Sequence, residues 1–287
     1  MTPRHSVATA SGCKGFTALA TLSLVADGTL DLGTTARSLL GDDLPLIDDT
    51  VTIAQLLSHT SGIGDYFDDD ADVSTYLLPV PAHALVDAED YVPILDGYPQ
   101  VFPPGTDTLY CNGAYAVLAL LAQRASGVPF HDLVRTRVLE PAGMTDSGYP
   151  RSDALPGHAA VGYVRVDGQW RSNVHHLPVV GGGDGGAYTS TLDMERLWAA
   201  LLGGRILPAD LVADARSVHA PETDDQYACG LGLWLPGDDV VALEGEDSGV
   251  SFWSTHEPRT GLTTTVAGTT DQAAWPVVKA LRAALAA

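Results

Sequence analysis

The spacing of apolar and polar residues changes near residue 160, from helical periods to short runs that are typical of strands. Residues 11–26 are apolar nearly all round, which indicates a buried helix, and the turn residues Asp27-Gly28 would end it. Residues 64–108 contain six prolines and should be rich in loops, because proline interrupts helices and strands. Before residue 160, helices are expected over 11–26, 51–59, 114–126 and 131–139.

After Gly162 the chain consists largely of short runs rich in β-branched and aromatic residues, separated by turns. Two more helices are expected, at 192–202 and from Trp275 to the C-terminus. Helices followed by a meander of strands indicate an α+β protein, in which an antiparallel sheet is flanked by helices, rather than an alternating dinucleotide-binding fold. The strands are expected over 160–166, 230–235, 240–244, 250–255 and 262–268.

Composition and charge narrow the choice of partners. A chain of 287 residues with 45% apolar content can bury a sizeable core. Its formal net charge of −21 repels phosphate backbones and anionic lipids, so neither nucleic acid nor a membrane is expected as a partner. No apolar run reaches the roughly 20 residues of a membrane span, and residues 15–26 lack the cleavage site of a signal peptide.

The cysteines and a histidine pair give no sign of a metal site or a disulfide framework. Cys13, Cys111 and Cys229 are odd in number and lack metal-ligand spacing, so we expect reduced thiols in a cytoplasmic protein. His175-His176 has no carboxylate or cysteine at metal spacing. Neither a metal ion nor a cofactor is expected.

The strongest candidate for chemistry is Ser11-Gly12-Cys13-Lys14, a Ser-x-x-Lys at the start of the first buried helix. Three residues of separation place both side chains on one helix face, where the amine can reach the hydroxyl. The helix N-terminus favours negative charge on Ser11, and burial lowers the pKa of a lysine, so that Lys14 could accept a proton. The chain has one other lysine, Lys279. Because lysine is so rare here, an amine inside an apolar helix indicates a function rather than a chance match.

Three later segments are weak signals individually, but their order after Ser-x-x-Lys is specific. They are LLSHTSG at 56–62, FPPG at 102–105 followed by Tyr110-Cys111-Asn112, and EPAGMTDSG at 140–148. Taken together, the chain resembles the serine β-lactamase and penicillin-binding-protein superfamily, in the branch that holds class C β-lactamases, family VIII carboxylesterases and D-aminopeptidases. The resemblance covers residues 5–200 well and the C-terminal strands more loosely.

This resemblance implies a β-lactamase/transpeptidase-like fold and a set of site residues. The chain would form one catalytic domain, with an α/β lobe of about 1–41 and 161–287 and an inserted, mostly helical lobe of about 42–160. Ser11 would be the acylated nucleophile, and Lys14 and Tyr110 would move protons. Either of these two could be the base. Asn112 would orient Lys14 and the substrate.

A third family motif, a cation followed by Thr or Ser and Gly, should lie on a late strand. The best match is Asp247-Ser248-Gly249, in which Asp247 replaces the cation that normally meets a substrate carboxylate. The substrate is therefore expected to be a neutral ester or amide, or to carry an amine. The backbone N–H groups of Ser11 and Val250 would form the oxyanion hole.

Other motifs are weaker. No Gly-x-Ser-x-Gly elbow occurs, and Asp247-Ser248-Gly249 has no partner segment of the chymotrypsin type. The Gly-x-Gly-x-x-Gly within 181–186 is not followed by a strand that ends in an acid, so we expect this loop to border the substrate cleft rather than bind a dinucleotide.

The expected function is that of a serine hydrolase acting through an acyl-enzyme on Ser11, foremost an esterase of small neutral esters. A D-amino-acid amidase or peptidase, a β-lactamase and a non-catalytic binding relative remain as alternatives. Relatives usually carry a helix and two strands before Ser-x-x-Lys, whereas ten residues precede Ser11 here. Either the start is misplaced, or the sheet exposes an edge at which the chain forms a homo-oligomer.

Overall fold

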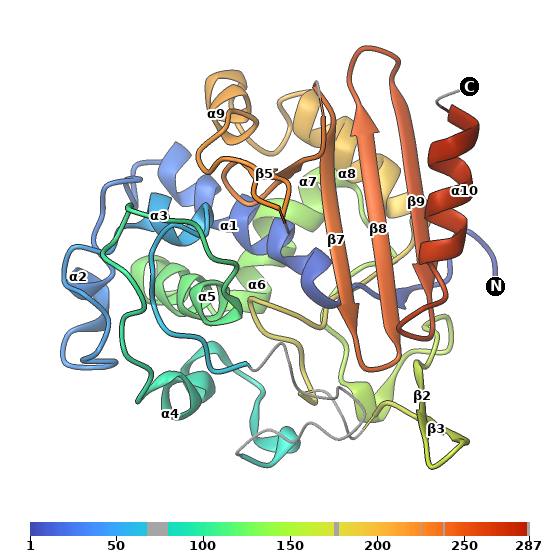
Figure 1. Cartoon of the computed structure of the whole chain (residues 1–287), viewed down its shortest axis with the longest axis horizontal. Coiled ribbons are helices and arrows are strands. Elements are labelled where there is room, and N and C mark those ends of the chain that lie inside the picture. The colour runs from blue at the N-terminus through green and yellow to red at the C-terminus, as the bar shows by residue number, and fades with distance from the viewer. Residues whose placement is uncertain (68–79, 175–177, 225, 238, 286–287) are drawn as a thin grey trace.

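An antiparallel sheet of five strands forms one side of the molecule, and most helices lie behind and beside it (Figure 1). The computed structural model describes residues 1–67, 80–174, 178–224, 226–237 and 239–285. The order of strands in the sheet follows the order in the chain. The strands are β5 (Ala228–Cys229), β6 (Trp234–Leu235), β7 (Val241–Asp247), β8 (Val250–Glu257) and β9 (Leu262–Gly268).

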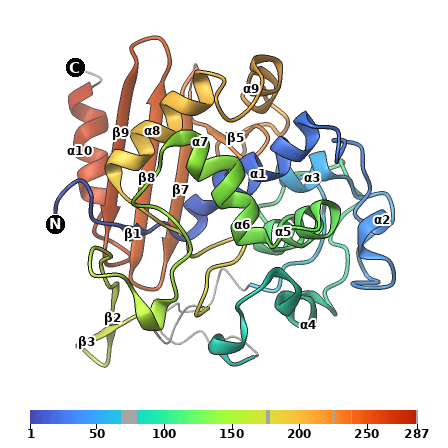
Figure 2. The same cartoon turned by 180° about the vertical axis from the view of Figure 1, so that it is seen from behind.

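Successive side chains of β8 point to opposite faces of the sheet, and a helix covers each face. Phe252 and Ser254 point to the inner face, where Ser254 accepts a hydrogen bond of 2.9 Å from the Trp198 indole of α8 (Thr191–Leu202). Trp253 points to the outer face and packs against Val278 of α10 (Trp275–Leu285). Figure 2 shows α8 crossing the back of the sheet, with α10 along its edge.

Four strands form two small separate sheets. β1 (Val7–Ala8) pairs with β4 (Tyr188–Thr189), and β2 (Tyr163–Val166) pairs with β3 (Gln169–Ser172). The predicted strand at 160–166 therefore exists in part but does not belong to the main sheet. Asp167 and Gly168 both have positive φ, which forms the tight turn of a hairpin and sends the chain back along β2.

The helical predictions are confirmed in position but not in every boundary. The predicted helix at 11–26 starts as a 3₁₀ turn, Ala10–Cys13, and continues as α1 (Lys14–Ala26). The helix predicted over 131–139 includes a π turn, Arg135–Leu139, and runs on past 139 into α7, because Pro141 fits the first turn of that helix. The other helices are α2 (Arg37–Leu40), α3 (Ile53–Leu57), α4 (Val92–Leu95), α5 (Asn112–Ser126), α6 (Phe130–Val134), α7 (Glu140–Ala142) and α9 (Ala209–Ala215), with short 3₁₀ turns at Ala82–Ala84, Ala88–Tyr91 and Ser152–Ala154.

One large core joins the helices to the sheet. Phe16 of α1, Tyr115 of α5, Trp198 of α8 and Phe252 of β8 are all buried within a single apolar cluster. The α+β architecture with an antiparallel sheet flanked by helices is thus confirmed, whereas the boundary between the two lobes stays a prediction. Within the described part of the chain, no helix is long and apolar enough to cross a membrane.

Candidate active site

Ser11 and Lys14 meet at the junction of the 3₁₀ turn and α1. The Lys14 Nζ donates a hydrogen bond of 2.9 Å to the Ser11 Oγ, as the three-residue spacing predicts. Lys14 is buried, with 5% of its surface exposed, whereas Ser11 is partly exposed and lines a cleft. Ala10, directly before Ser11, has φ of +45°, a region that costs a non-glycine residue energy and is common beside functional sites.

The chain at the start of α5 brings two more predicted residues to the same point. The Tyr110 Oη lies 2.7 Å from the Ser11 Oγ, and the Asn112 Oδ1 accepts a hydrogen bond of 2.8 Å from the Lys14 Nζ. The four side chains of Ser11, Lys14, Tyr110 and Asn112 therefore form one connected cluster. The structure brings these predicted residues together, although their catalytic roles stay predictions.

Asp65, which no sequence motif indicated, holds the start of α5 in place. Its two carboxylate oxygens accept hydrogen bonds of 2.5 Å from the Asn112 N–H and 2.9 Å from the Gly113 N–H. A carboxylate at a helix N-terminus satisfies free N–H groups and is favoured by the helix dipole. Asp65 thereby fixes the position of Asn112 in the cluster.

The glycine-rich loop borders the cleft, as expected, and contributes a residue that the sequence did not single out. The backbone oxygen of Asp184 accepts a hydrogen bond of 2.7 Å from the Lys14 Nζ, and its carboxylate accepts one of 2.5 Å from the Tyr66 hydroxyl. Asp184 and Gly185 both line the cleft. Asp184 is 8% exposed, so its carboxyl is largely removed from water.

The pKa of Lys14 moves in the opposite direction to the sequence-based expectation. Burial lowers this pKa, but attraction to Tyr110 and to Asp184 outweighs burial, and the pKa of Lys14 is raised above its usual value. Neighbouring His59 shows the converse effect. Burial and the charge of Lys14 lower the pKa of His59 to about 3, so its ring is neutral and its Nδ1 accepts a hydrogen bond of 3.2 Å from the Cys111 N–H.

The third motif was predicted at Asp247-Ser248-Gly249, but in the structure a different glycine lies against the nucleophile. Gly245 of β7, rather than Gly249, lies against the nucleophile, since a Cβ on Gly245 would be 2.7 Å from the backbone nitrogen of Ser11. A Cβ on Gly249 would instead meet Tyr163 and Asn173. The physical reason is the register of the sheet, because β7 continues to Asp247 and pairs Gly245 with Phe252.

The other residues of that prediction lie at the far end of the hairpin. Ser248 and Gly249 form the turn between β7 and β8, where the Ser248 carbonyl accepts a hydrogen bond of 2.8 Å from the Asn173 amide. Val250 pairs with Asp247 and is buried against Ala8, Ala10 and Tyr188. Of the residues Asp247 to Val250, the cleft lining includes Asp247 alone. Burial raises the pKa of Asp247 to about 6.

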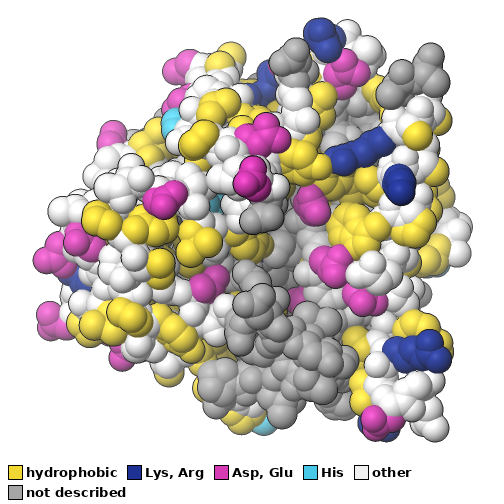
Figure 3. Space-filling model, in the orientation of Figure 1, with side chains coloured by type: hydrophobic (Ala, Val, Ile, Leu, Met, Phe, Trp, Pro, Cys, Tyr) yellow, Lys and Arg dark blue, Asp and Glu magenta, His cyan; other side chains and the backbone are white. Residues whose placement is uncertain are grey.

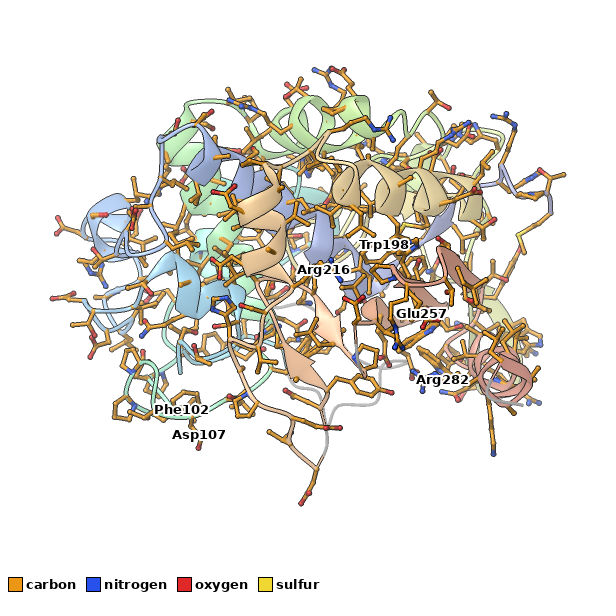
Figure 4. All side chains as sticks on the ribbon, turned by 90° about the horizontal axis from the view of Figure 1, so that it is seen from above. Phe102, Asp107, Trp198, Arg216, Glu257 and Arg282 are labelled. Carbon is orange, nitrogen blue, oxygen red and sulfur yellow. The ribbon has the colours of Figure 1, made fainter. Side chains whose placement is uncertain are left out.

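The cleft that contains Ser11 has a volume of 590 Å³ and an acidic lining. Figure 3 shows acidic side chains around the hollow in the middle of this face. Arg282 is the cation among the described residues that line it, and it stacks on Trp253 with 4.3 Å between the guanidinium carbon and the ring centroid. Figure 4 shows Arg282 on α10, at the sheet end of the molecule. The acids of the lining are Asp184, Glu222, Asp224, Glu244, Glu246 and Asp247.

No group of three or more potential metal ligands occurs among the residues that the structure describes. The His175-His176 pair lies outside the described residues. All three cysteines are free and buried.

Comparison with known proteins identifies the family. The β-lactamase family model matches residues 1–285, so the chain belongs to the β-lactamase family, and the resemblance based on its motifs is confirmed. The crystal structure of a penicillin-binding protein from Bacillus halodurans shares 34% identity with a TM-score of 0.92, over 98% of this chain and 87% of that one. The β-lactamase/transpeptidase-like fold is thereby confirmed as well.

Two curated relatives match over shorter stretches. Penicillin-binding protein 4* of Bacillus subtilis (strain 168) is 32% identical over 119 residues, which are 40% of this chain and 25% of that protein. Esterase EstB of Burkholderia gladioli is 33% identical over 160 residues, which are 52% of this chain and 41% of that protein. The matches therefore span less than half the length of these relatives.

Proposed function

We propose that the protein is a serine hydrolase that forms an acyl ester on Ser11 and acts foremost on small neutral esters. The observation that carries this proposal is the geometry at the Ser11 Oγ, which has the Lys14 Nζ at 2.9 Å and the Tyr110 Oη at 2.7 Å. A hydroxyl with two proton-transfer groups in contact is an activated nucleophile. Similarity to esterase EstB supports ester hydrolysis.

In this mechanism the Ser11 Oγ attacks the ester carbonyl while the Lys14–Tyr110 pair takes its proton. The carbonyl oxygen becomes an oxyanion, which the backbone N–H of Ser11 stabilises together with a backbone N–H of β7 beside Gly245, in place of Val250. The pair then protonates the leaving alcohol. Water, deprotonated by the same pair, releases the acid and regenerates Ser11.

Fluorophosphonate labelling followed by intact-mass measurement tests the proposal without a choice of substrate. We expect one adduct per chain, mapped to Ser11, and none in Ser11→Ala. Ser38→Ala, a change at an exposed serine of α2, serves as the matched control and should label like the unmodified protein. A chain that takes up no adduct would instead be a non-catalytic binding relative.

The acidic cleft supports a second candidate, hydrolysis of amides or esters that carry a free amine. Six carboxylates and one guanidinium in the lining attract a cation and repel an anion. Amino-acid p-nitroanilides of both configurations, each compared with its N-acetyl form, separate the candidates. Faster turnover of the free-amine D-amino-acid substrates would favour an amidase or peptidase, whereas no turnover of any anilide alongside hydrolysis of p-nitrophenyl butyrate would favour the neutral ester.

We also propose a cytoplasmic location, supported by the free thiols, and association of copies through β9, which is an outer strand of the five-stranded sheet. Light scattering tests the association. A mass of about one chain across a concentration series would contradict it.

A further inference from the structure

The segment LLSHTSG at 56–62 takes no part in the proposed reaction, although it lies against the chain that carries Tyr110. His59, in the middle of this segment, is 2% exposed and has φ of +59°, a left-handed conformation in which histidine, asparagine and aspartate are enriched. The preceding helix α3 lies beside α5 (Figures 1 and 2), and the Leu57 carbonyl accepts a hydrogen bond of 2.8 Å from the Tyr115 hydroxyl of α5. The turn at His59 is thereby attached to the helix that begins at the active site.

Tyr110, in contrast, lies on irregular chain. Residues 96–111 are all described, and they form neither helix nor strand. Leu109, directly before Tyr110, is 48% exposed. Loops are more mobile than the elements they connect, so a side chain on a loop keeps a fixed position only where the backbone around it is held.

His59 holds the backbone on both sides of Tyr110. Its carbonyl oxygen accepts a hydrogen bond of 3.0 Å from the Leu109 N–H, and its Nδ1 accepts one of 3.2 Å from the Cys111 N–H. The ring centroids of His59 and Tyr110 are 4.8 Å apart, and the Trp234 ring stacks on His59 at 5.7 Å. His59 therefore contacts the amide before Tyr110, the amide after it and the ring between them, and these three contacts form a clamp on Tyr110.

The charge state of the His59 ring suits this clamp. The Nδ1 of an imidazole accepts a hydrogen bond only when it carries no proton. Burial and the charge of Lys14 lower the pKa of His59 to about 3, so the ring is neutral near pH 8. The acceptor is thus present at the pH at which esterase activity would be measured.

We propose that His59 is a positioning residue, which clamps the backbone around Tyr110 and so keeps the Tyr110 Oη within 2.7 Å of the Ser11 Oγ. This inference rests on the proposed function, because Tyr110 is a proton-transfer group of that reaction. A displacement of about 1 Å can lower a rate by about 10²-fold, since proton transfer requires a short contact. The clamp also gives a physical reason for LLSHTSG to accompany the tyrosine segment, because each segment supplies one half of it.

Three substitutions of His59 separate the acceptor from the ring. His59→Asn carries its Oδ1 on Cγ, the atom that carries Nδ1 in histidine, so this variant keeps an acceptor and tolerates the positive φ. His59→Gly tolerates the positive φ as well but has neither acceptor nor ring. His59→Phe keeps an aromatic ring and removes the acceptor. His83→Gly, the same change at an exposed histidine, is the matched control.

The two variants that lack the acceptor should lose kcat rather than substrate binding. For p-nitrophenyl butyrate we expect kcat to fall by about 10- to 100-fold in His59→Gly and at least about fivefold in His59→Phe, with KM changed less than about threefold. His59→Asn should keep at least about a third of kcat, because its amide restores the acceptor. His83→Gly should match the unmodified chain. Undiminished kcat in His59→Gly or His59→Phe, or a kcat of His59→Asn as low as that of His59→Gly, would overturn the inference.

Combination with Tyr110→Phe distinguishes the positioning of Tyr110 from a general loss of structure. If His59 acts through Tyr110, His59→Gly should lower kcat by less than about twofold in a chain that already carries Tyr110→Phe, since no hydroxyl is left to misplace. A loss as large as in the chain with Tyr110 would mean that His59 supports the fold or the nucleophile instead, and the inference would be wrong.

Hydrogen exchange measured by mass spectrometry tests the clamp without turnover. The amides of Leu109 and Cys111 are its two donors, so a peptide covering 108–112 should exchange slowly in the unmodified chain and in His59→Asn. In His59→Gly the same peptide should exchange at least about fivefold faster, because the side-chain acceptor is gone. Fast exchange of this peptide in the unmodified chain would overturn the inference, whether or not the variants fold.

The two proposals fail in different ways. Absence of fluorophosphonate labelling in the unmodified chain, together with a protected 108–112 peptide, would count against the proposed function. Normal labelling together with fast exchange of that peptide, or with additive loss in the Tyr110→Phe chain, would count against the role of His59 alone.

Discussion

On the nucleophile side of the cleft, the Ser11 Oγ lies 2.9 Å from the Lys14 Nζ and 2.7 Å from the Tyr110 Oη, whereas the opposite wall is an open surface of acids and aromatic rings. On the first side Lys14 and Asn112 are buried and Ser11 and Tyr110 are half-buried, and hydrogen bonds connect the four side chains. The second side comes from β7, residues 222–224, 226 and 227, and α10, and its one described cation stacks on a ring instead of pairing at close range with an acid.

The two sides of the cleft therefore contribute differently: the nucleophile side provides reactivity, and the opposite wall provides substrate selectivity. Bond-making requires atoms held within tenths of an ångström, which only a dense hydrogen-bonded cluster provides. Discrimination by charge acts over several ångströms and needs no such precision. Substitutions on the nucleophile side should therefore act mainly on kcat, and substitutions on the opposite wall on KM and on the choice of substrate.

The largest effect is expected from Ser11→Ala, which removes the atom that attacks the ester. Turnover of p-nitrophenyl acetate or butyrate should fall by at least about 10⁴-fold, and Lys14→Ala should be nearly as inactive, while circular dichroism shows a folded chain. Ser38→Ala should retain full activity. If Ser11→Ala keeps most of its activity, the nucleophile has been assigned wrongly.

Tyr110→Phe comes next, because it removes one proton-transfer group and leaves the nucleophile. We expect kcat to fall by about 10²- to 10⁴-fold with little change in KM, which is the usual contribution of acid–base catalysis. Steady-state kinetics measure both parameters. If Tyr110→Phe raised KM and kept kcat, this result would contradict the assignment of reactivity to the nucleophile side.

Substrate charge should have a smaller effect, located on the opposite wall. At pH 8 the acids of the cleft repel a carboxylate, so benzylpenicillin should be hydrolysed at least about tenfold more slowly than p-nitrophenyl butyrate. Asp247→Lys should shift preference toward substrates that carry a carboxylate. Added salt should weaken the discrimination, because it screens exposed charges.

The pH dependence of this discrimination has a definite sign. The pKa of Asp247 is raised to about 6, so this carboxyl is charged above pH 6 and becomes neutral as the pH falls through that value. Discrimination against anionic substrates should therefore be largest above pH 6 and decrease below it, and Asp247→Asn should remove much of this dependence. Benzylpenicillin turned over as fast as p-nitrophenyl butyrate at pH 8 and physiological salt would contradict the role of the acidic wall.

The smallest effect is expected from Arg282→Ala. Its stacking on Trp253 has a value of about 0.5–1 kcal/mol at a partly exposed site, so KM for neutral esters should rise about two- to fivefold with kcat unchanged. Lys279→Ala, an exposed cation on the same helix, is the control and should leave both parameters unchanged. A fall in kcat for Arg282→Ala would show that the two walls are not separable.

The sequence by itself determined the features that depend on neighbours along the chain. Ser11 and Lys14 could be paired from their spacing because one helical turn brings them together, whatever the rest of the fold does. The strands at 250–255 and 262–268 and the helices at 114–126 and 192–202 could be predicted because side-chain periodicity is local as well. The order of the motifs then identified the family.

Tertiary structure decided what depends on contacts between distant segments. Lys14 and Asp184 lie 170 positions apart, and Tyr66 and Asp184 lie 118 apart, so no periodicity links them. The third motif was placed wrongly for the same reason. Strand register is set by pairing across the sheet, and the pairing of Gly245 with Phe252 brings Gly245 against Ser11, where a side chain would collide with the backbone.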